Sequence, residues 1–300
     1  MGQITLFDIQ EKSEKANGNT FENWLLVDGD NILNRTFHAT KYEYKTAPDG
    51  RHTNGVSAFL KMVFGYQRKF SANIVVFFDQ GKGFRKELYP EYKDGRKEKP
   101  EELIQQFPTL KEVLLAADIP SFESDYFEAD DLIASSISKL QGHKYILSND
   151  KDLLQLVSDD VTVIRKGNKN VDSLITPETF TNEYPGMTPL QIVDIKALAG
   201  DSSDNIKGVP GIGEKGAFNL VQFYGTVENM IVSTECPKEL KRYFTKLMAA
   251  KEDAIFSKML TTLRKDASIT IQARPLNEHG LREQCDILSL VIIKAYMNLY

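Results

Sequence analysis

The chain has 300 residues, of which 41% are hydrophobic and 26% are charged, and its formal net charge is −5. This composition supports a folded core and excludes a chain that is disordered throughout. The only two cysteines have no metal-type spacing and imply no disulfide framework, so a cytoplasmic location is expected. We expect no signal peptide, because the N-terminus lacks a basic region followed by an apolar one. We expect no membrane span either, because the longest apolar stretch, near residues 288–293, is too short to cross a bilayer.

Residues 8–23 are polar and lack apolar periodicity, so residues 1–23 are predicted to form a flexible tail. The apolar runs that follow, WLLVDGDN, NIVVFFD and HKYILSNDKD, each end in aspartate, which is typical of a buried strand and a turn. Helical patterns over 55–69, about 101–116 and 130–140 lie between or after them. This alternation predicts an α/β core over residues 24–185, with a mostly parallel central sheet flanked by helices.

Residues 186–300 are predicted to be mostly helical, and they contain the glycine-rich sequence GVPGIGEKGA at 208–217. A predicted helix at 189–199 precedes it and another follows. A glycine-rich turn that opens a helix offers backbone amides to a phosphate, although a plain corner between two helices explains the same residues. The candidates for contact with a nucleic-acid backbone are Gly208, Gly211, Gly213 and Lys215.

Acidic side chains are predicted to gather at the carboxyl edge of the sheet, where open parallel sheets bind ligands. Residues two apart on a helix face nearly opposite sides, so in the sequence EADDLI we expect Glu128 just before a helix and the next two acids in its first turn. The strand ends, this helix start and the sequence GDSSDN together contribute nine carboxylates: Asp28, Asp79, Glu128, Asp130, Asp131, Asp150, Asp152, Asp201 and Asp204.

Each acidic motif alone has an ordinary explanation, because acids favour helix N-termini and turns. Nine carboxylates in one cleft, however, need cations, and oxygen ligands without histidine or cysteine favour Mg²⁺ or Mn²⁺. Pairs of such ions, about 3.5–4 Å apart, typically serve phosphodiester hydrolysis. Setting the nine acids aside changes the net charge from −5 to +4, so the overall charge does not exclude a nucleic-acid partner.

The sequence GKGFRKELYPEYKDGRKEKP at 81–100 interleaves basic and aromatic residues. This pattern suits a nucleic-acid strand, with charges for phosphates and rings for bases, and an ordinary solvated loop is the alternative. Its position directly after Asp79, beside the predicted cleft, favours the first interpretation. The residues singled out are Arg85, Lys86, Tyr92, Lys93 and Arg96.

Six motifs in order, spanning about residues 24–225, resemble the 5′-nuclease or flap-endonuclease family, which includes the 5′→3′ exonuclease domain of bacterial DNA polymerase I. They are VDGDN, FFD, FRKELYPEYKDGR, EADDLIA, SNDKDLLQLV and GDSSDNIKGVPGIGEKGA. The resemblance implies a stand-alone, metal-dependent 5′→3′ exonuclease and flap endonuclease. Its substrates would be DNA with 5′ flaps, nicks or 5′ ends, or RNA–DNA hybrids, in RNA primer removal, replication and repair. It also implies an arch or gateway at about 81–105 and a helix–three-turn–helix at about 189–225.

The resemblance further implies a role for each matching residue. One of two Mg²⁺ or Mn²⁺ sites would be formed by Asp28, Asp79, Glu128 and Asp130. The other would be formed by Asp150, Asp152, Asp201 and Asp204, with Asp131 in an outer shell. Lys93 and Arg96 match the catalytic pair that steers the scissile phosphate, and Tyr92 matches an aromatic residue that stacks beside it. The turn from Gly208 to Lys215 would grip duplex DNA, in some members with a bound monovalent cation.

The N-terminal sequence QITLF resembles the pentapeptide by which bacterial replication proteins dock on the β sliding clamp. There Leu6 and Phe7 would fill an apolar pocket while Gln3 hydrogen-bonds at its rim, although three fixed positions also arise by chance. We expect a monomer associated with the nucleoid. The alternatives are a PIN-type endoribonuclease, against which GVPGIGEKGA argues, and a catalytically silent DNA-binding or clamp-tethered scaffold.

Overall fold

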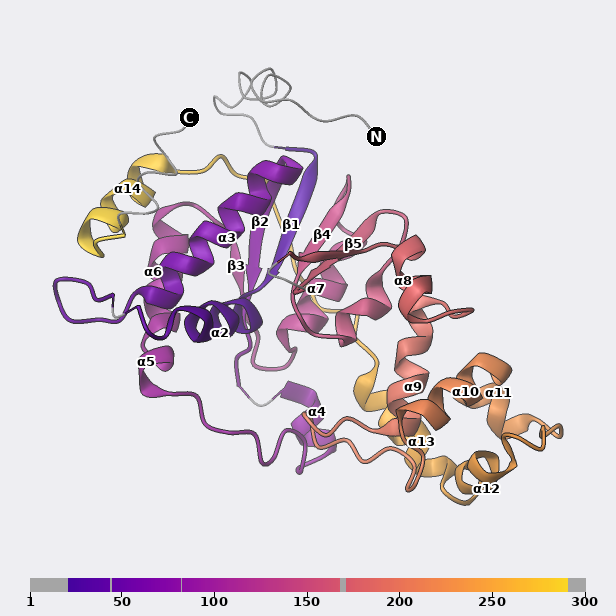
Figure 1. Ribbon diagram of the computed structural model, residues 1–300. Coiled ribbons are helices and arrows are strands. Elements are labelled where there is room, and N and C mark those ends of the chain that lie inside the picture. Colours follow the sequence, from indigo (N-terminus) through magenta and orange to yellow (C-terminus); the bar gives the residue numbers. More distant parts are fainter. Residues whose placement is uncertain (1–20, 44, 82, 168–170, 291–300) are drawn as a thin grey trace.

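A six-stranded sheet lies at the centre of the computed structural model, which describes residues 21–43, 45–81, 83–167 and 171–290 (Figure 1). The strand order is β3-β2-β1-β4-β5-β6, and only β6 runs antiparallel to its neighbour. This confirms the predicted α/β fold with a mostly parallel sheet. The strands are β1 (Asn23–Asp28), β2 (Ala72–Phe77), β3 (Ser121–Phe122), β4 (Lys144–Leu147), β5 (Val161–Arg165) and β6 (Ser173–Ile175).

Helices cover both faces of the sheet, because alternate residues of each buried strand point to opposite sides. In β1, Leu25 and Val27 join one apolar cluster, while Trp24 and Leu26 join the other. The first cluster packs against α2 (Gly29–Thr40), α3 (Asn54–Phe70), α6 (Gln106–Ala116) and α14 (Glu278–Ile287). The second packs against α7 (Ala129–Ile137) and the C-terminal helices.

The parallel register sets three strand ends side by side. Asp28, the last residue of β1, lies beside Phe77 of β2, and Val27 lies beside Leu147 of β4. The chain therefore leaves all three strands at one edge of the sheet, where Asp79 and Asp150 follow within a few residues.

The rest of the described chain is mostly helical. Residues 83–104 form two short helices, α4 (Gly83–Leu88) and α5 (Glu101–Ile104), joined by an irregular segment. The short helix η2 (Asp152–Leu156) lies between β4 and β5. After β6 come α8 (Pro177–Glu183), η4 (Pro189–Gln191), α9 (Ile192–Ala199), α10 (Glu214–Tyr224), α11 (Val227–Val232), α12 (Lys241–Ala249) and α13 (Lys251–Thr261). Figure 1 shows α4 beside the loops of this C-terminal helical part. Across the described residues, no helix has the length and apolar character needed to span a membrane.

Candidate active site

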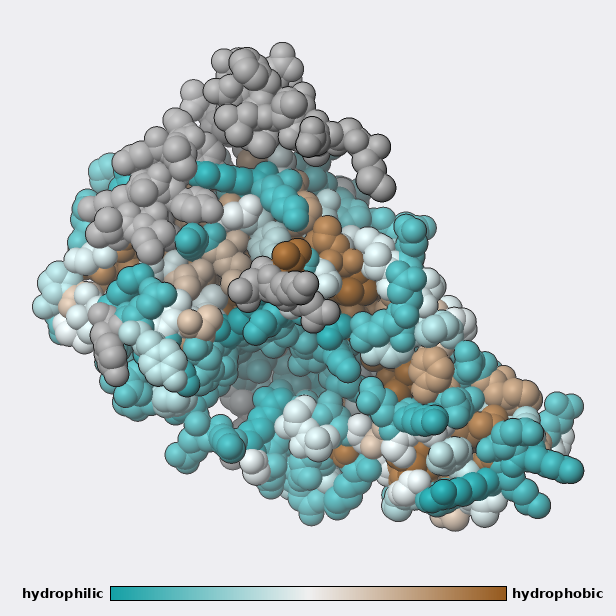
Figure 2. Space-filling model, viewed as in Figure 1, coloured by the Kyte–Doolittle hydropathy of each residue, from teal (hydrophilic) through white to brown (hydrophobic). Residues whose placement is uncertain are grey.

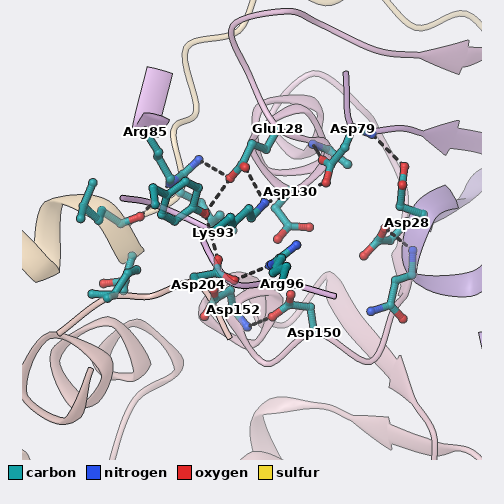
Figure 3. Close-up of a pocket in the computed structure, with 18 of the residues that line it drawn as sticks. Asp28, Asp79, Arg85, Lys93, Arg96, Glu128, Asp130, Asp150, Asp152 and Asp204 are labelled. Carbon is teal, nitrogen blue, oxygen red and sulfur yellow. Dashed lines mark hydrogen bonds and ion pairs between the residues drawn. The ribbon is translucent and has the colours of Figure 1, made fainter. Parts of the chain in front are cut away.

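A pocket of about 200 Å³ opens at the carboxyl edge of the sheet. Figure 2 shows hydrophilic residues around a hollow on this face of the molecule, and Figure 3 shows acidic and basic side chains that point toward one another in the pocket. Eight carboxylates line it: Asp28, Asp30, Asp79, Glu128, Asp130, Asp150, Asp152 and Asp204. Four basic side chains line it as well: Arg85, Lys93, Arg96 and Lys99.

Seven of the nine carboxylates chosen from the sequence therefore share one pocket. Asp201 does not line it but is tied to it, since the ammonium of Lys196 lies 2.6 Å from an oxygen of Asp201 and also contacts Asp152. Asp131 lies outside the pocket and is fully buried. The sequence analysis missed Asp30 and Lys196. Their signals were an acid two residues after Asp28 and a lysine within the apolar run of α9.

The start of α7 has the predicted geometry. Glu128 is the N-cap with an extended backbone, and Asp130 and Asp131 lie in the first helical turn. The amide of Ala129 donates to an Asp79 oxygen at 2.8 Å, which joins the helix start to the end of β2. Glu128 and Asp130 therefore both reach the pocket even though they lie two residues apart.

Lys93 lies between two of these carboxylates. Its φ of 59° places it in the left-handed region, which is unusual for a residue with a side chain. Its amide donates to the Asp204 carbonyl at 2.9 Å, while its ammonium binds Glu128 and lies 3.9 Å from an Asp79 oxygen. The strained backbone thus directs the ammonium into the pocket.

Two further basic residues of the same segment bind pocket carboxylates. Arg96 binds Asp204, and Lys99 binds Asp30 at 2.6 Å. Asp30 also accepts a hydrogen bond from the amide of Asp79 at 3.0 Å. The 93–99 segment is thereby fixed across the pocket by ion pairs.

Crowding of the carboxylates changes their pKa values. Burial, with the nearby charges of Asp79 and Asp150, raises the pKa of Asp28 to about 7. Burial and the charge of Asp150 raise the pKa of Asp152 to about 7, although Lys196 opposes this change. The pKa of Asp130 is also raised, by burial and by neighbouring aspartates.

The pKa of Asp201 changes in the opposite direction. Burial alone would raise it, but Lys196 and the hydroxyl and amide of Ser203 lower it to about 2. Carboxylates with raised pKa values need positive charge to ionise together, so the pocket favours cations.

The donor set fits divalent cations in its chemistry, because hard ions prefer carboxylate oxygens. Within the described ranges, no three carboxylates, histidines or cysteines already converge as a preformed metal site. The carboxylates are instead engaged by basic side chains: Lys93 lies between Glu128 and Asp79, and Lys196 lies between Asp152 and Asp201. Arg96 binds Asp204. Metal ligation here would require these side chains to exchange partners.

Two residues expected to contact DNA, Arg85 and Tyr92, have buried side chains that bind within the protein. The Arg85 side chain is 2% exposed and binds Asp131 and Glu128. The Tyr92 ring is also buried, and its hydroxyl lies 3.0 Å from Glu128 and 2.9 Å from Asp204. Both side chains line the pocket, but their polar groups are engaged by carboxylates of the protein.

Lys86, another expected DNA contact, lies outside the pocket lining. Its ammonium donates to the Tyr92 carbonyl at 3.0 Å and binds Asp94. Lys86 thus stabilises the loop that carries Lys93.

The glycine-rich sequence connects α9 to α10, as expected. Gly208 (φ 63°) and Gly211 (φ 78°) are left-handed. A Cβ on Gly208 would lie 2.2 Å from the Gly200 amide nitrogen, so only glycine fits. Gly213 is the N-cap of α10, and Lys215 lies in its exposed first turn. The amides at this helix start suit an anion.

Family comparisons match both halves of this architecture. A 5′-3′ exonuclease N-terminal resolvase-like domain matches residues 23–185, and a 5′-3′ exonuclease C-terminal SAM fold matches residues 187–284. The fold and the site are thus those of a nuclease class with an acidic cleft. The chain belongs to the 5′-3′ exonuclease family.

Curated relatives agree with this assignment. A 5′-3′ exonuclease of Halalkalibacterium halodurans is 36% identical over 277 residues, which cover 88% of this chain and 90% of that protein. DNA polymerase I of Bacillus caldotenax is 41% identical over 263 residues, covering 85% of this chain and 29% of that protein. The chain thus spans less than a third of the length of its DNA polymerase I relatives.

Solved structures share the fold. The bacteriophage T5 5′-exonuclease with bound zinc has a TM-score of 0.67 at 26% identity, covering 88% of this chain and 99% of that one. A bacteriophage T5 flap endonuclease complex with DNA and metal ions has a TM-score of 0.63 at 25% identity, covering 90% and 93%. The catalytic core of Rad2 with DNA is 16% identical with a TM-score of 0.57, covering 95% and 94%, which is a likeness of fold alone. Gln3, Leu6 and Phe7, the residues expected from the sequence to bind a clamp, lie outside the described residues.

Proposed function

We propose that this chain is a divalent-metal-dependent 5′ nuclease that hydrolyses phosphodiesters at 5′ ends and flaps of DNA or RNA–DNA hybrids. The observation that carries the proposal is the gathering of seven expected carboxylates and Lys93 on one pocket. The metal-bound and DNA-bound bacteriophage T5 relatives support it. RNA primer removal, replication and repair are the processes that such an activity would serve.

The charge of the pocket supports two ions of the Mg²⁺ or Mn²⁺ type. Its eight carboxylates and four basic side chains leave a formal charge of −4 when all are ionised, which equals in size the charge of two divalent cations. The raised pKa of Asp28 shows that ionisation is incomplete without them. We assign the first ion to Asp28, Asp79, Glu128 and Asp130, and the second to Asp150, Asp152, Asp201 and Asp204.

The chain's own residues would then position the phosphate. Divalent ions, when bound, lower the pKa of a water and polarise the phosphodiester. Lys93 and Arg96, released from Glu128 and Asp204, would bind the oxygens of the transferring phosphate and stabilise the charge that develops there. Tyr92 would hold Glu128 and Asp204 in place through its hydroxyl.

The remaining assignments concern DNA and partners. We propose that the helix–three-turn–helix around residues 189–225, with Gly208, Gly211, Gly213 and Lys215, binds the duplex backbone, in some conditions with a monovalent cation. We further propose that QITLF binds a β sliding clamp, which would place the enzyme at the nucleoid. Clamp capture that is unchanged after deletion of residues 1–8 would contradict this part.

The test is cleavage of a 5′-labelled flap DNA with Mg²⁺ and with EDTA, beside a nicked duplex and an RNA–DNA hybrid. We expect metal-dependent release near the junction. Asp130→Ala should lower the rate by several orders of magnitude, and Lys93→Ala should lower it about 10²–10³-fold, with DNA binding retained. Lys69→Ala, at the far end of α3, is the matched surface control. Binding without cleavage by the wild type would favour the scaffold alternative.

A further inference from the structure

All five N–H donors of the Arg85 guanidinium are engaged, and they join three segments that are far apart in sequence. Nη1 and Nη2 donate to the two Asp131 oxygens at 2.6 and 2.9 Å, and Nη1 also donates to Glu128 at 3.0 Å. Nε donates to the Leu260 carbonyl at 2.7 Å, and Nη2 donates to the Thr262 carbonyl at 3.1 Å. Arg85 thus connects α4, the start of α7 and the end of α13.

Asp131 completes the connection. Besides Arg85, its oxygens accept the amide of Glu128 at 3.2 Å and the amide of Arg264 at 2.8 Å. Its side chain is fully buried, and each of its oxygens accepts two hydrogen bonds from the protein. A buried ion pair with this degree of satisfaction fixes geometry more than it adds stability.

The connection continues to the hairpin between α9 and α10. Ser257 of α13 accepts the Gly208 amide with its hydroxyl at 3.2 Å, one turn before the Leu260 carbonyl that Arg85 binds. Helix α13 therefore contacts the glycine-rich turn at one point and Arg85 near its C-terminal end. Figure 3 shows Arg85 and Glu128 bonded on one side of the pocket, next to Lys93.

We propose that Arg85 and Asp131 are a positioning pair that holds the Glu128 carboxylate in the pocket and sets the hairpin's position relative to it through α13. The pair contacts neither DNA nor the reacting atoms. The proposal rests on the proposed nuclease function for its kinetic consequences, while its structural consequences stand alone.

Arginine is required because its planar fork can bind a carboxylate in two places and two carbonyls at once. Lysine has three donors on one nitrogen. It would keep a positive charge near Glu128 but lose the two-point contact with Asp131. Arg85→Lys therefore removes the geometry and retains the charge.

The experiment compares Arg85→Lys with wild type in single-turnover cleavage of flap DNA at saturating enzyme, and in DNA affinity measured in EDTA. We expect the cleavage rate to fall about 10²-fold, as for a misplaced catalytic group, with affinity within about threefold. Asp131→Asn, which keeps the shape of the side chain, should likewise lower the cleavage rate and leave DNA affinity nearly unchanged, and it serves if the first variant folds poorly.

The matched control is Lys144→Gln. Lys144 is a buried cation that binds the Leu140 and Gly142 carbonyls and Asp160, away from the pocket. Its substitution should lower the melting temperature and leave the cleavage rate unchanged. If Lys144→Gln lowers the cleavage rate as much as Arg85→Lys does, the effect of Arg85→Lys is explained by general destabilisation and the proposal is wrong.

A cleavage rate of Arg85→Lys equal to that of wild type would also overturn the proposal. A loss of DNA affinity with no loss of cleavage rate would overturn it too, and would indicate that Arg85 contacts DNA directly. Hydrogen exchange gives a readout that is independent of cleavage. The amides of Arg264 and Gly208 should exchange faster in Arg85→Lys and not in Lys144→Gln. If the wild type does not cleave, the proposed function is wrong, and the exchange rates of the Arg264 and Gly208 amides still test whether Arg85 holds these segments in position.

Discussion

Replacing one buried carboxylate should stabilise the metal-free protein while removing its activity. Asp28 caps α2 by accepting the Asn31 amide at 3.1 Å and accepts the Ser148 hydroxyl at 2.8 Å. Asparagine has the same shape and is an equally good N-cap, so Asp28→Asn keeps most of these bonds. What it removes is a negative charge beside Asp79 and Asp150.

The size of the effect follows from the pKa of Asp28, which burial and neighbouring carboxylates raise from 3.8 to about 7. Each pKa unit corresponds to about 1.4 kcal/mol, so the ionised carboxylate destabilises the folded state by about 4 kcal/mol at pH 8. Loss of the Ser148 bond offsets about 1 kcal/mol of the gain. At about 2–4 °C per kcal/mol, the remaining gain of about 3 kcal/mol should make metal-free Asp28→Asn melt roughly 6–12 °C above wild type.

The sign of the pH dependence is fixed by the raised pKa. Below about pH 4 the carboxyl is protonated in both folded and unfolded wild type, so its charge no longer separates the two proteins, and Asp28→Asn should melt slightly below wild type because it lacks the Ser148 bond. Between about pH 4 and 7 only the unfolded wild type ionises at this residue, so wild type loses stability as pH rises. The gap in melting temperature between Asp28→Asn and wild type therefore widens over this range and is constant above about pH 7. Mg²⁺ should narrow the gap, because the wild type binds the ion more tightly.

Thermal unfolding in EDTA from pH 4 to 8 measures this gap. Asp49→Asn is the matched control, since Asp49 is exposed and its pKa is lowered by hydrogen bonds from Arg51. It should not stabilise the protein at pH 8. A gap that is independent of pH, or an Asp28→Asn protein that is less stable than wild type at pH 8, would refute the reasoning.

Two further substitutions test the revised roles of residues near the pocket. Tyr92→Phe removes the hydroxyl that binds Glu128 and Asp204, and we expect the single-turnover rate to fall about tenfold with flap-DNA affinity unchanged; an affinity loss instead would support contact with a base. Gly211→Ala forces a side chain into a left-handed backbone and toward the Lys246 ammonium, 2.2 Å from the new Cβ. Duplex affinity should fall about tenfold while the rate at saturation is kept, and unchanged affinity would argue against the hairpin as a duplex-binding element.

Much of the site could be predicted because local patterns determine it. Apolar runs that end in aspartate gave both the strands and the carboxylates at their ends, since parallel strands finish at one edge. The two-residue spacing of Glu128 and Asp130 set the start of α7, because helical geometry allows no other way for both to reach one cleft. These inferences need only the chain near each residue.

The features that were missed depend on contacts between distant segments. Arg85 lies 46 residues from Asp131 and 175 from Leu260, and no periodicity in a basic loop shows that one of its arginines is buried. In the sequence, Lys196 resembles any lysine near the end of a helix, and only the folded structure shows its contact with Asp152. The basic residues around Tyr92 suggested an exposed aromatic ring, but the ring is buried.

The ion pairs of the pocket imply that the same basic side chains first neutralise the carboxylates and later bind the substrate phosphate. Lys93 and Arg96 hold Glu128 and Asp204 in the described structure, which keeps neighbouring carboxylates apart and the loop ordered. A metal that takes these carboxylates would free both cations at the moment a phosphate needs them. The left-handed backbone at Lys93, bonded to the Asp204 carbonyl, keeps the ammonium aimed at the pocket through this exchange. On this view, Lys93 and Arg96 neutralise the carboxylates in place of metal ions before substrate arrives and bind the substrate phosphate afterwards. A rearrangement of side chains is then enough to change the pocket from the first state to the second.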